Sequence, residues 1–140
     1  MQQAFETLSI ATNGKGLTEF TRSVRGFVAG SGVGKGLLTV YVRHTSCSLI
    51  IQENADPDVQ TDLEDFFRRL VPEGMEWIVH TTEGPDDMPA HIRAALTQTS
   101  LAIPIIDAQP VLGTWQGIYL FEHRTRPHNR QVVLHAIGEA

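Results

Sequence analysis

The last forty residues of the chain carry four apolar runs in close succession, and such a pattern leaves few folds open. The runs read LAIPIID, QPVLG, TWQGIYLFEHR and RQVVLHAIG, with turn-forming residues between them. Short runs rich in β-branched and aromatic residues are typical of strands. Pro104 in the first run marks an edge or bulged strand, because proline offers no N–H to a neighbouring strand. This part of the chain therefore predicts a sheet.

Three amphipathic segments in the first hundred residues predict helices. The first is capped by Thr18 and ends at Gly30, the second begins at Asp56-Pro57, and the third begins near Met88. The apolar side chains expected to face the core are Phe20, Val24, Phe27 and Val28, then Val59, Leu63, Phe66, Phe67 and Leu70, then Ile92, Ala95 and Leu96. Helices followed by several strands in series predict an α+β domain.

Further strands are expected in the first hundred residues. Ala4 to Thr12 alternates loosely, and a second run places Leu38, Val40 and Val42 on one face. Glu76 to Thr82 is predicted to be a strand that carries His80 on the same face as Ile78. These strands add to the sheets formed by the end of the chain.

Length and composition limit the class of protein. The chain has 140 residues, so residues 1–140 are expected to form one domain. Its net charge of −5 argues against a nucleic-acid binder, whose footprint is a basic surface. The sequence has neither an apolar run long enough to span a membrane nor a signal peptide, and its single cysteine cannot form an internal disulfide. We therefore expect a cytoplasmic protein that binds neither nucleic acid nor membranes.

A polar cluster interrupts the most apolar stretch, VYVRHTSCSLIIQEN at residues 40–54. The cluster is His44-Thr45-Ser46-Cys47, and the strands on either side would hold it rigidly. His44 is either part of a site or an ordinary polar residue at a strand end. Cys47 is interpreted as a small buried hydrophobe, because a nucleophile would need a lowered pKa.

Three histidines lie near acids or hydroxyl groups and suggest chemistry. His44, His80 and His91 could hold zinc with an open position, or serve as general acids or phosphate donors. Asp87 lies four residues before His91, so the two can meet on one side of a helix. Asp86 is expected to be either a helix cap or a site residue.

Two further features concern binding. Arg124, Arg126 and Arg130 surround the last turn and form either an anion clamp or a solvated patch. Trp115 and Gln116 point to opposite faces of a strand, so we predict that Trp115 is buried and structural and that Gln116 is functional. No HExxH, CxxC, Walker or GxSxG motif is present.

Taken together, five motifs resemble the YjbQ family, whose members are associated with a secondary thiamine-phosphate synthase activity. The motifs are HTSCSL, QENADPDV, DDMPAHIR, LGTWQGIYL, and EHR followed by RQVVLHAIG. The resemblance covers nearly the whole chain. It implies a compact α+β fold of barrel-like or sandwiched mixed β-sheets, a homotrimer, and one cleft lined by the HTS, ENAD, AHIR and TWQ motifs.

The activity that the resemblance implies joins hydroxymethylpyrimidine diphosphate to a thiazole phosphate and releases pyrophosphate. Glu53, Asp56 and Asp87 would suit Mg²⁺, which prefers carboxylates and substrate phosphate. No organic cofactor is expected. The residues assigned to catalysis are His44, Glu53, His80, Asp87 and His91, and those assigned to the phosphorylated substrate are Thr45, Ser46, Cys47, Asn54, Asp56, Gln116, Glu122, Arg124, Arg126 and Arg130.

Two rival functions stay open at this point. One is a zinc-dependent hydrolase that uses His44, His80 and His91. The other is a non-catalytic trimer that binds a metabolite or another protein. Among the histidines, we expect His91 to be central, because the first turn of its helix brings it to Asp87.

Overall fold

A computed structural model describes all of residues 1–140, and it confirms the α+β class. The elements in chain order are β1 (Gln2–Thr12), β2 (Gly16–Glu19), α1 (Thr21–Gly30), β3 (Lys35–Val42), β4 (Cys47–Glu53), α2 (Pro57–Leu70), α3 (Asp87–Leu96), β5 (Ser100–Ile106), β6 (Gln109–Pro110), β7 (Gln116–Glu122) and β8 (His128–Glu139).

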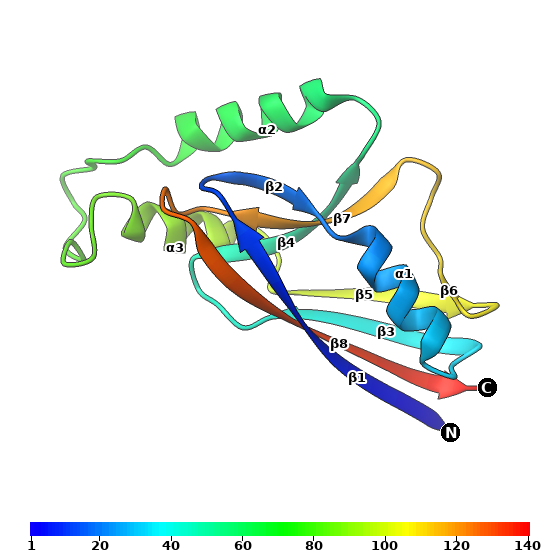
Figure 1. Ribbon diagram of the computed structural model, residues 1–140. Coiled ribbons are helices and arrows are strands. Elements are labelled where there is room, and N and C mark those ends of the chain that lie inside the picture. Colours follow the sequence, from blue (N-terminus) through cyan, green and yellow to red (C-terminus); the bar gives the residue numbers. More distant parts are fainter.

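Two sheets form the frame of the molecule. One has five strands in the order β1-β8-β3-β5-β6, and the other has three in the order β2-β7-β4. Every pairing is antiparallel, so the sheets are not of mixed direction. Figure 1 shows the five-stranded sheet curling below the smaller one, with α1 beside the sheets and α2 above β2.

The core lies between the two sheets and α1, as side-chain alternation along the strands requires. Leu38 and Val40 of β3 point inward with Leu134 of β8, and the smaller sheet contributes Leu49 and Leu120; each of these side chains has no exposed surface. Helix α1 adds Val24 and Val28, which are equally buried. The helix and strand patterns in these segments therefore predicted the core correctly.

Strands β3 and β8 approach closely near the end of the chain. Gly36 pairs with Gly138 in the register, and a Cβ added to either residue would overlap the backbone of the other strand. Glycine is needed there because it has no side chain. Gln2 of β1 also pairs with Gly138, so the two termini lie side by side, as Figure 1 shows.

One predicted helix start and one predicted strand are wrong. Thr18 lies in β2 instead of capping a helix, and α1 begins at Thr21 after Phe20. Residues 76–82 form turns and loop and contain no strand. The side chains of Trp77 and Val79 in this segment are 66% and 94% exposed, because no neighbouring strand pairs with it and no layer covers it. An apolar run without a partner does not make a strand.

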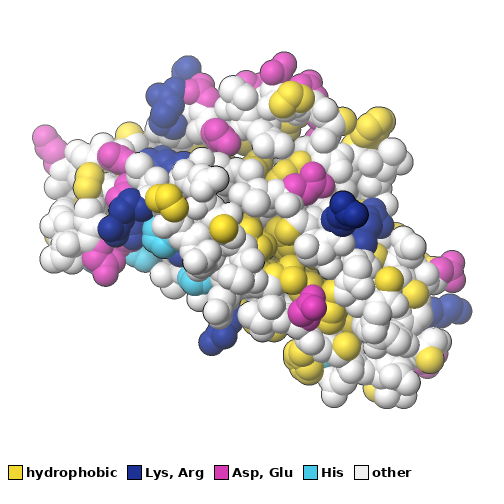
Figure 2. All heavy atoms as spheres, in the orientation of Figure 1, with side chains coloured by type: hydrophobic (Ala, Val, Ile, Leu, Met, Phe, Trp, Pro, Cys, Tyr) yellow, Lys and Arg dark blue, Asp and Glu magenta, His cyan; other side chains and the backbone are white.

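The predicted apolar faces of the other two helices need correction as well. No residue of α2 is buried, and its Phe66 and Leu70 are 55% and 53% exposed. Apolar side chains appear among the charged ones over α2 in Figure 2. Helix α3 buries Ala90 and Arg93 and leaves Leu96 exposed. None of the three helices is long and apolar enough to cross a membrane.

Candidate metal centre

The beginning of α3 places two functional side chains one turn apart, as their spacing predicts. Asp87 is the first residue of the helix and His91 lies on the following turn. Asp86, at the N-cap position, makes no side-chain cap, so of its two expected roles the helix cap is excluded. Its carboxylate instead accepts hydrogen bonds from Nε of Arg124 and the backbone N–H of Thr125, both at 2.9 Å.

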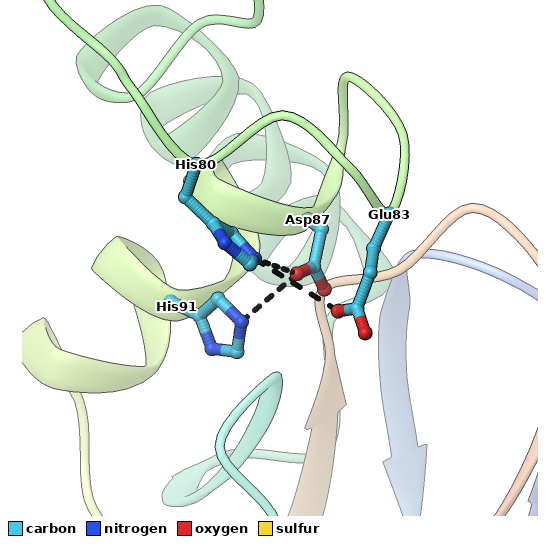
Figure 3. A group of neighbouring side chains, drawn as sticks. All are labelled: His80, Glu83, Asp87 and His91. Atoms are coloured by element: carbon cyan, nitrogen blue, oxygen red, sulfur yellow. Dashed lines mark hydrogen bonds and ion pairs between the residues drawn. The ribbon is translucent and has the colours of Figure 1, made fainter.

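Asp87 is the centre of the site and is almost completely buried. Its Oδ2 lies 2.7 Å from Nε2 of His80 and 3.0 Å from Nε2 of His91. Its Oδ1 accepts a hydrogen bond of 2.8 Å from Arg124. Glu83 lies on the preceding loop, 3.8 Å from Nε2 of His80. Figure 3 shows the two rings and the two carboxylates pointing toward one another.

A second contact, on the side of the His91 ring away from Asp87, fixes the orientation of the ring. Its Nδ1 lies 2.8 Å from the carbonyl oxygen of Thr45, and a carbonyl can only accept, so Nδ1 carries the hydrogen. In the neutral ring, Nε2 then presents a lone pair to the carboxylate of Asp87. Two lone pairs repel, so this arrangement needs either a second proton on the ring or a cation between the two atoms. A histidine that donates its other N–H to a carbonyl is the usual partner of a metal ion.

Four side chains in this region have ligand atoms within 4.8 Å of one another: His80, Glu83, Asp87 and His91. Imidazole and carboxylate together suit zinc and related divalent ions. The predicted set of three histidines is therefore only partly assembled, because His44 is not a member of this group. Glu83 was not predicted as a site residue, although it lies three residues after His80 and four before Asp87.

The carboxylates of Asp86 and Asp87 are each stabilised in their ionised form by neighbouring donors. Burial alone would raise the pKa of Asp86, but hydrogen bonds from Arg124 and Thr125 outweigh it and lower the pKa to about 2. Burial also opposes ionisation of Asp87, and the hydrogen bond from His80 again holds its pKa below the usual value. Both carboxylates are thus ionised at neutral pH.

A hollow of about 590 Å³ opens beside this candidate metal centre and shares His91 with it. Its lining residues are Tyr41, Val42, Arg43, His44, Thr45, His91, Ala94, Ala95 and Thr99. Nε2 of His44 accepts a hydrogen bond of 2.9 Å from the backbone N–H of Gln131. Burial and the charge of Arg130 lower the pKa of His44, so the ring is neutral at pH 7. Figure 2 shows histidine side chains reaching the surface near α3.

A comparison with family models decides what kind of chain this is. The model described as "UPF0047 protein YjbQ-like" matches residues 6–139. The chain belongs to the YjbQ family.

Relatives in this family match over almost their whole length. A UPF0047 protein of Synechocystis sp. is 59% identical over 138 residues, which cover 99% of this chain and 94% of that protein. The UPF0047 protein YjbQ of Escherichia coli O157:H7 is 38% identical, covering 96% of this chain and 97% of its own. The crystal structure of a conserved hypothetical protein from Thermus thermophilus has a TM-score of 0.84 at 31% identity, covering 94% and 99% of the two chains. These matches confirm the predicted family.

In this YjbQ-family chain, two of the three predicted arginines are already paired. Arg124 binds Asp86 and Asp87. Arg130 is buried and donates to Glu122, at 2.8 Å from Nε and 2.5 Å from Nη2. Arg126 is exposed, and neither it nor Arg43 in the hollow has a carboxylate partner. Arg43 is therefore the arginine of the hollow that has no carboxylate partner.

The Arg130–Glu122 pair holds the corner that contains the HTS motif. Nη2 of Arg130 donates to Oγ of Ser46 at 3.0 Å, and Thr12 donates to Glu122 at 2.6 Å. Beside them, Cys47 is buried, and burial raises the pKa of its thiol to about 12. The prediction that Cys47 packs as a small hydrophobe is confirmed.

The remaining predicted site residues lie at the other end of β4. The strand begins at Cys47 and ends at Glu53, which pairs with Gln116. Seven residues of strand span roughly 20 Å. Asp56 caps α2 by accepting from the backbone N–H of Asp58 at 2.9 Å, as predicted for the helix start. Asn54 adjoins this end, so the residues of the single cleft expected from the resemblance are divided between the two ends of β4.

Two corrections follow from this division. A magnesium site made of Glu53, Asp56 and Asp87 is not formed within one chain, because the strand separates Glu53 from Asp87. Trp115 lies in the turn before β7 and is 62% exposed, so it is not the buried anchor that strand alternation predicts. Gln116 is exposed, and its Oε1 accepts from the N–H of Gly113 at 2.7 Å.

Proposed function

We propose that this YjbQ-family protein is a metal-dependent enzyme that acts on a phosphorylated small molecule. His80, Glu83, Asp87 and His91 would hold the metal ion. The observation that carries the proposal is the ring of His91, whose Nδ1–H is taken by Thr45 while Nε2 faces the carboxylate of Asp87. That orientation leaves the Nε2 lone pair for a cation.

The substrate would occupy the 590 Å³ hollow that shares His91 with the metal group. Arg43 lines this hollow without a carboxylate partner and would bind a phosphate oxygen. His44 is neutral and fixed by Gln131, so it would present its ring to the substrate without adding charge. A divalent ion would stabilise the negative charge that grows on a departing phosphate or diphosphate.

The residues of the chain itself would supply orientation. Arg124 binds both Asp86 and Asp87 and thereby fixes the first turn of α3. Thr45 fixes the ring of His91 from the opposite side. A rigid constellation of this kind favours catalysis because it needs no reorganisation during the reaction.

Within this class, we propose the thiamine-phosphate synthase reaction as a secondary activity. The hydrolysis of a phosphate ester needs the same metal group, and the two reactions differ in whether water or thiazole phosphate is the acceptor. Purified protein would be incubated with hydroxymethylpyrimidine diphosphate, with and without thiazole phosphate, and pyrophosphate release measured. Release that requires thiazole phosphate supports synthase activity, and release without it supports hydrolysis. No release of phosphate or pyrophosphate from a broad panel of phosphate esters would contradict an enzymatic role.

We also propose that the protein assembles as a homotrimer. Large apolar side chains stay exposed on a single chain: Phe5, Tyr41 and Leu37 on the five-stranded sheet are 65%, 47% and 42% exposed. Phe66 and Leu70 on α2 are exposed as well, on the other side of the molecule. Contiguous exposed apolar surface is typical of subunit contacts. Light scattering should give the mass of three chains, and the mass of one chain at working concentration would contradict the proposal.

A further inference from the structure

A second hollow of about 380 Å³ lies between α2 and the smaller sheet. Figure 1 shows α2 passing above β2 and β7 in this region. Eleven residues line it, among them Lys15, Asp62, Glu64, Phe67, Arg93 and Phe121. It shares no residue with the metal group or with the hollow beside His91. The two regions are therefore separate sites.

Arg93 is the unusual residue of this hollow. It is only 5% exposed, and its Nη2 donates to the carbonyl oxygen of Val71 at 2.9 Å. No carboxylate lies within ion-pair distance of its guanidinium, and its Nε is buried without a hydrogen-bond partner. A buried charge without an acceptor is costly, and native proteins rarely leave one in that state.

The buried groups behind Arg93 provide no free negative charge that could neutralise its guanidinium. His123 is buried, and burial together with the nearby charge of Arg93 lowers its pKa to about 3. Its Nε2 lies 2.9 Å from Oγ of Ser48, while its Nδ1 has no partner. Glu122 lines the hollow, but Arg130 and Thr12 already neutralise it. The charge of Glu73 also acts on Arg93, but Glu73 is paired with Lys15 at 3.0 Å, so the guanidinium of Arg93 is left for a group that enters from the hollow.

The rim of the hollow has the opposite charge. Asp62 and Glu64 are exposed on α2 and form no ion pair. The carboxylate of Asp65 is neutralised by Arg68 and Arg69, and Lys15 is paired with Glu73 at 3.0 Å. Two free carboxylates at the entrance repel a multiply charged phosphate but attract an ammonium group.

The walls between the two ends are aromatic. Phe67 of α2 and Phe121 of β7 meet edge to face, with ring centroids 5.4 Å apart. They would pack against an apolar body of modest size.

We propose that this hollow binds a small zwitterion of the amino-acid type with an apolar side chain. Its carboxylate pairs with Arg93, its side chain packs on Phe67 and Phe121, and its ammonium group lies toward Asp62 and Glu64. A guanidinium suits this role because it donates two parallel hydrogen bonds to a carboxylate. The proposal goes beyond the metal-dependent function, because it uses none of the residues of that site.

Three matched probes test the assignment in calorimetric titrations of the full-length protein. L-phenylalanine carries both charges, 3-phenylpropionate lacks the ammonium group, and phenethylamine lacks the carboxylate. We expect phenylalanine to bind best, 3-phenylpropionate several-fold more weakly, and phenethylamine not at all. Addition of phenylalanine should also shift the Nε–H resonance of Arg93 in a ¹H–¹⁵N spectrum. No binding of phenylalanine at millimolar concentration would overturn the proposal, as would equal binding of phenylalanine and either of the other probes.

Variants separate the parts of the site. Arg93→Lys keeps the charge but loses the two-pronged geometry and should weaken phenylalanine at least tenfold. Asp62→Asn with Glu64→Gln changes only exposed side chains, so it tests the site even where Arg93 variants fold poorly. This double variant should weaken phenylalanine several-fold and should not weaken 3-phenylpropionate, because the two carboxylates attract only the ammonium group and repel an anion. His91→Ala is the control for the metal site and should leave phenylalanine binding intact. Wild-type affinity in folded Arg93→Lys, or in the double variant, would overturn the proposal.

Discussion

At the scale of single residues, His91 connects two motifs that lie far apart in the sequence. Its Nδ1 lies 2.8 Å from the carbonyl oxygen of Thr45 in the HTS corner, and its Nε2 lies 3.0 Å from Asp87. The spacing of Asp87 and His91 predicts half of this arrangement, because it follows from the helical repeat. The contact with Thr45 could not be predicted, since it depends on how α3 packs against the corner. Glu83 could not be predicted as a site residue either, because the conformation of its loop, and no regular repeat, brings it to His80.

We predict that His91→Ala folds but binds a divalent ion more weakly. Loss of one interaction with a charged group corresponds to roughly 1.5–3 kcal/mol, or about tenfold to a hundredfold in affinity. Metal content of protein purified without chelator, followed by titration with zinc, measures the change. His135→Ala is the matched control, because His135 lies on the five-stranded sheet and stacks on Phe5. Equal zinc affinity in both variants would refute the assigned ligand.

Cys47 should be unreactive in the folded protein. Burial raises the pKa of its thiol to about 12, so at pH 8 only roughly one molecule in 10⁴ carries the thiolate that reacts. We expect a disulfide reagent such as Ellman's reagent to label it slowly in buffer and rapidly in denaturant. The reaction can be followed by absorbance. Fast stoichiometric labelling of the native protein would show that Cys47 is accessible and ionised.

At the scale of elements, helices α2 and α3 show that a local sequence pattern predicts where a helix begins better than which of its faces is buried. The start of α2 follows from Asp56-Pro57, and the structure confirms this start. The residues against which each helix packs cannot be predicted from its own sequence, because the packing depends on segments far away in the chain. Helix α3 turns Arg93 inward and His91 toward His80 and Asp87, and Arg93 and His91 lie on different sides of the helix because they are two residues apart. Residues 76–82 have a strand-like composition but no strand beside them, so the sequence pattern there was misleading.

We predict that Asp56→Ala destabilises the protein through the end of α2. The Asp56 side chain accepts from the backbone N–H of Asp58, and loss of such a cap costs about 0.5–2 kcal/mol. Urea denaturation at pH 7 measures the difference. The control is Asp62→Ala, an exposed change in the middle of the same helix without a capping bond. A midpoint for Asp56→Ala that equals that of Asp62→Ala would argue against a stabilising cap.

At the scale of the whole molecule, one buried network ties the sheets together. Arg130 of β8 binds Glu122 of β7, and Thr12 at the end of β1 binds the same carboxylate. Ser46 joins the network from the HTS corner. The runs of apolar residues predict that these strands exist. They do not predict which strands pair, because pairing over more than a hundred residues leaves no local signal.

We predict that stability declines in two stages as the pH falls. The folded pKa of His123 is lowered to about 3, chiefly by burial, so below its unfolded value near 6.5 the unfolded chain takes up a proton that the folded one refuses. This first loss begins near pH 6.5, and His44, whose pKa is also lowered, adds to it.

The second stage belongs to carboxylates whose pKa is lowered in the folded protein, among them Glu122, Asp86 and Asp87. Glu122, in the network between the sheets, has the most buried side chain of these three. Burial alone would raise its pKa, but hydrogen bonds from Arg130 and Thr12 hold the pKa below the usual value. The stability that these bonds contribute is present above the unfolded pKa of about 4.3 and is lost as the pH falls further. Urea midpoints at pH 7.5, 5.5 and 4 should fall in that order. His123→Gln should reduce the first step, and an unchanged midpoint between pH 7.5 and 5.5 in the unaltered protein would contradict the prediction.

The adjacent chain ends have a practical consequence for protein engineering. Gln2 and Gly138 are paired neighbours on β1 and β8, and Figure 1 shows both termini at the end of the molecule away from α3. A short flexible linker can therefore join the two ends, and new ends can be opened in the exposed loop at residues 76–79. Such a circular permutant would keep every strand neighbour. A label or an immobilising tag attached at either end of residues 1–140 would likewise lie on the side of the molecule away from the candidate metal centre.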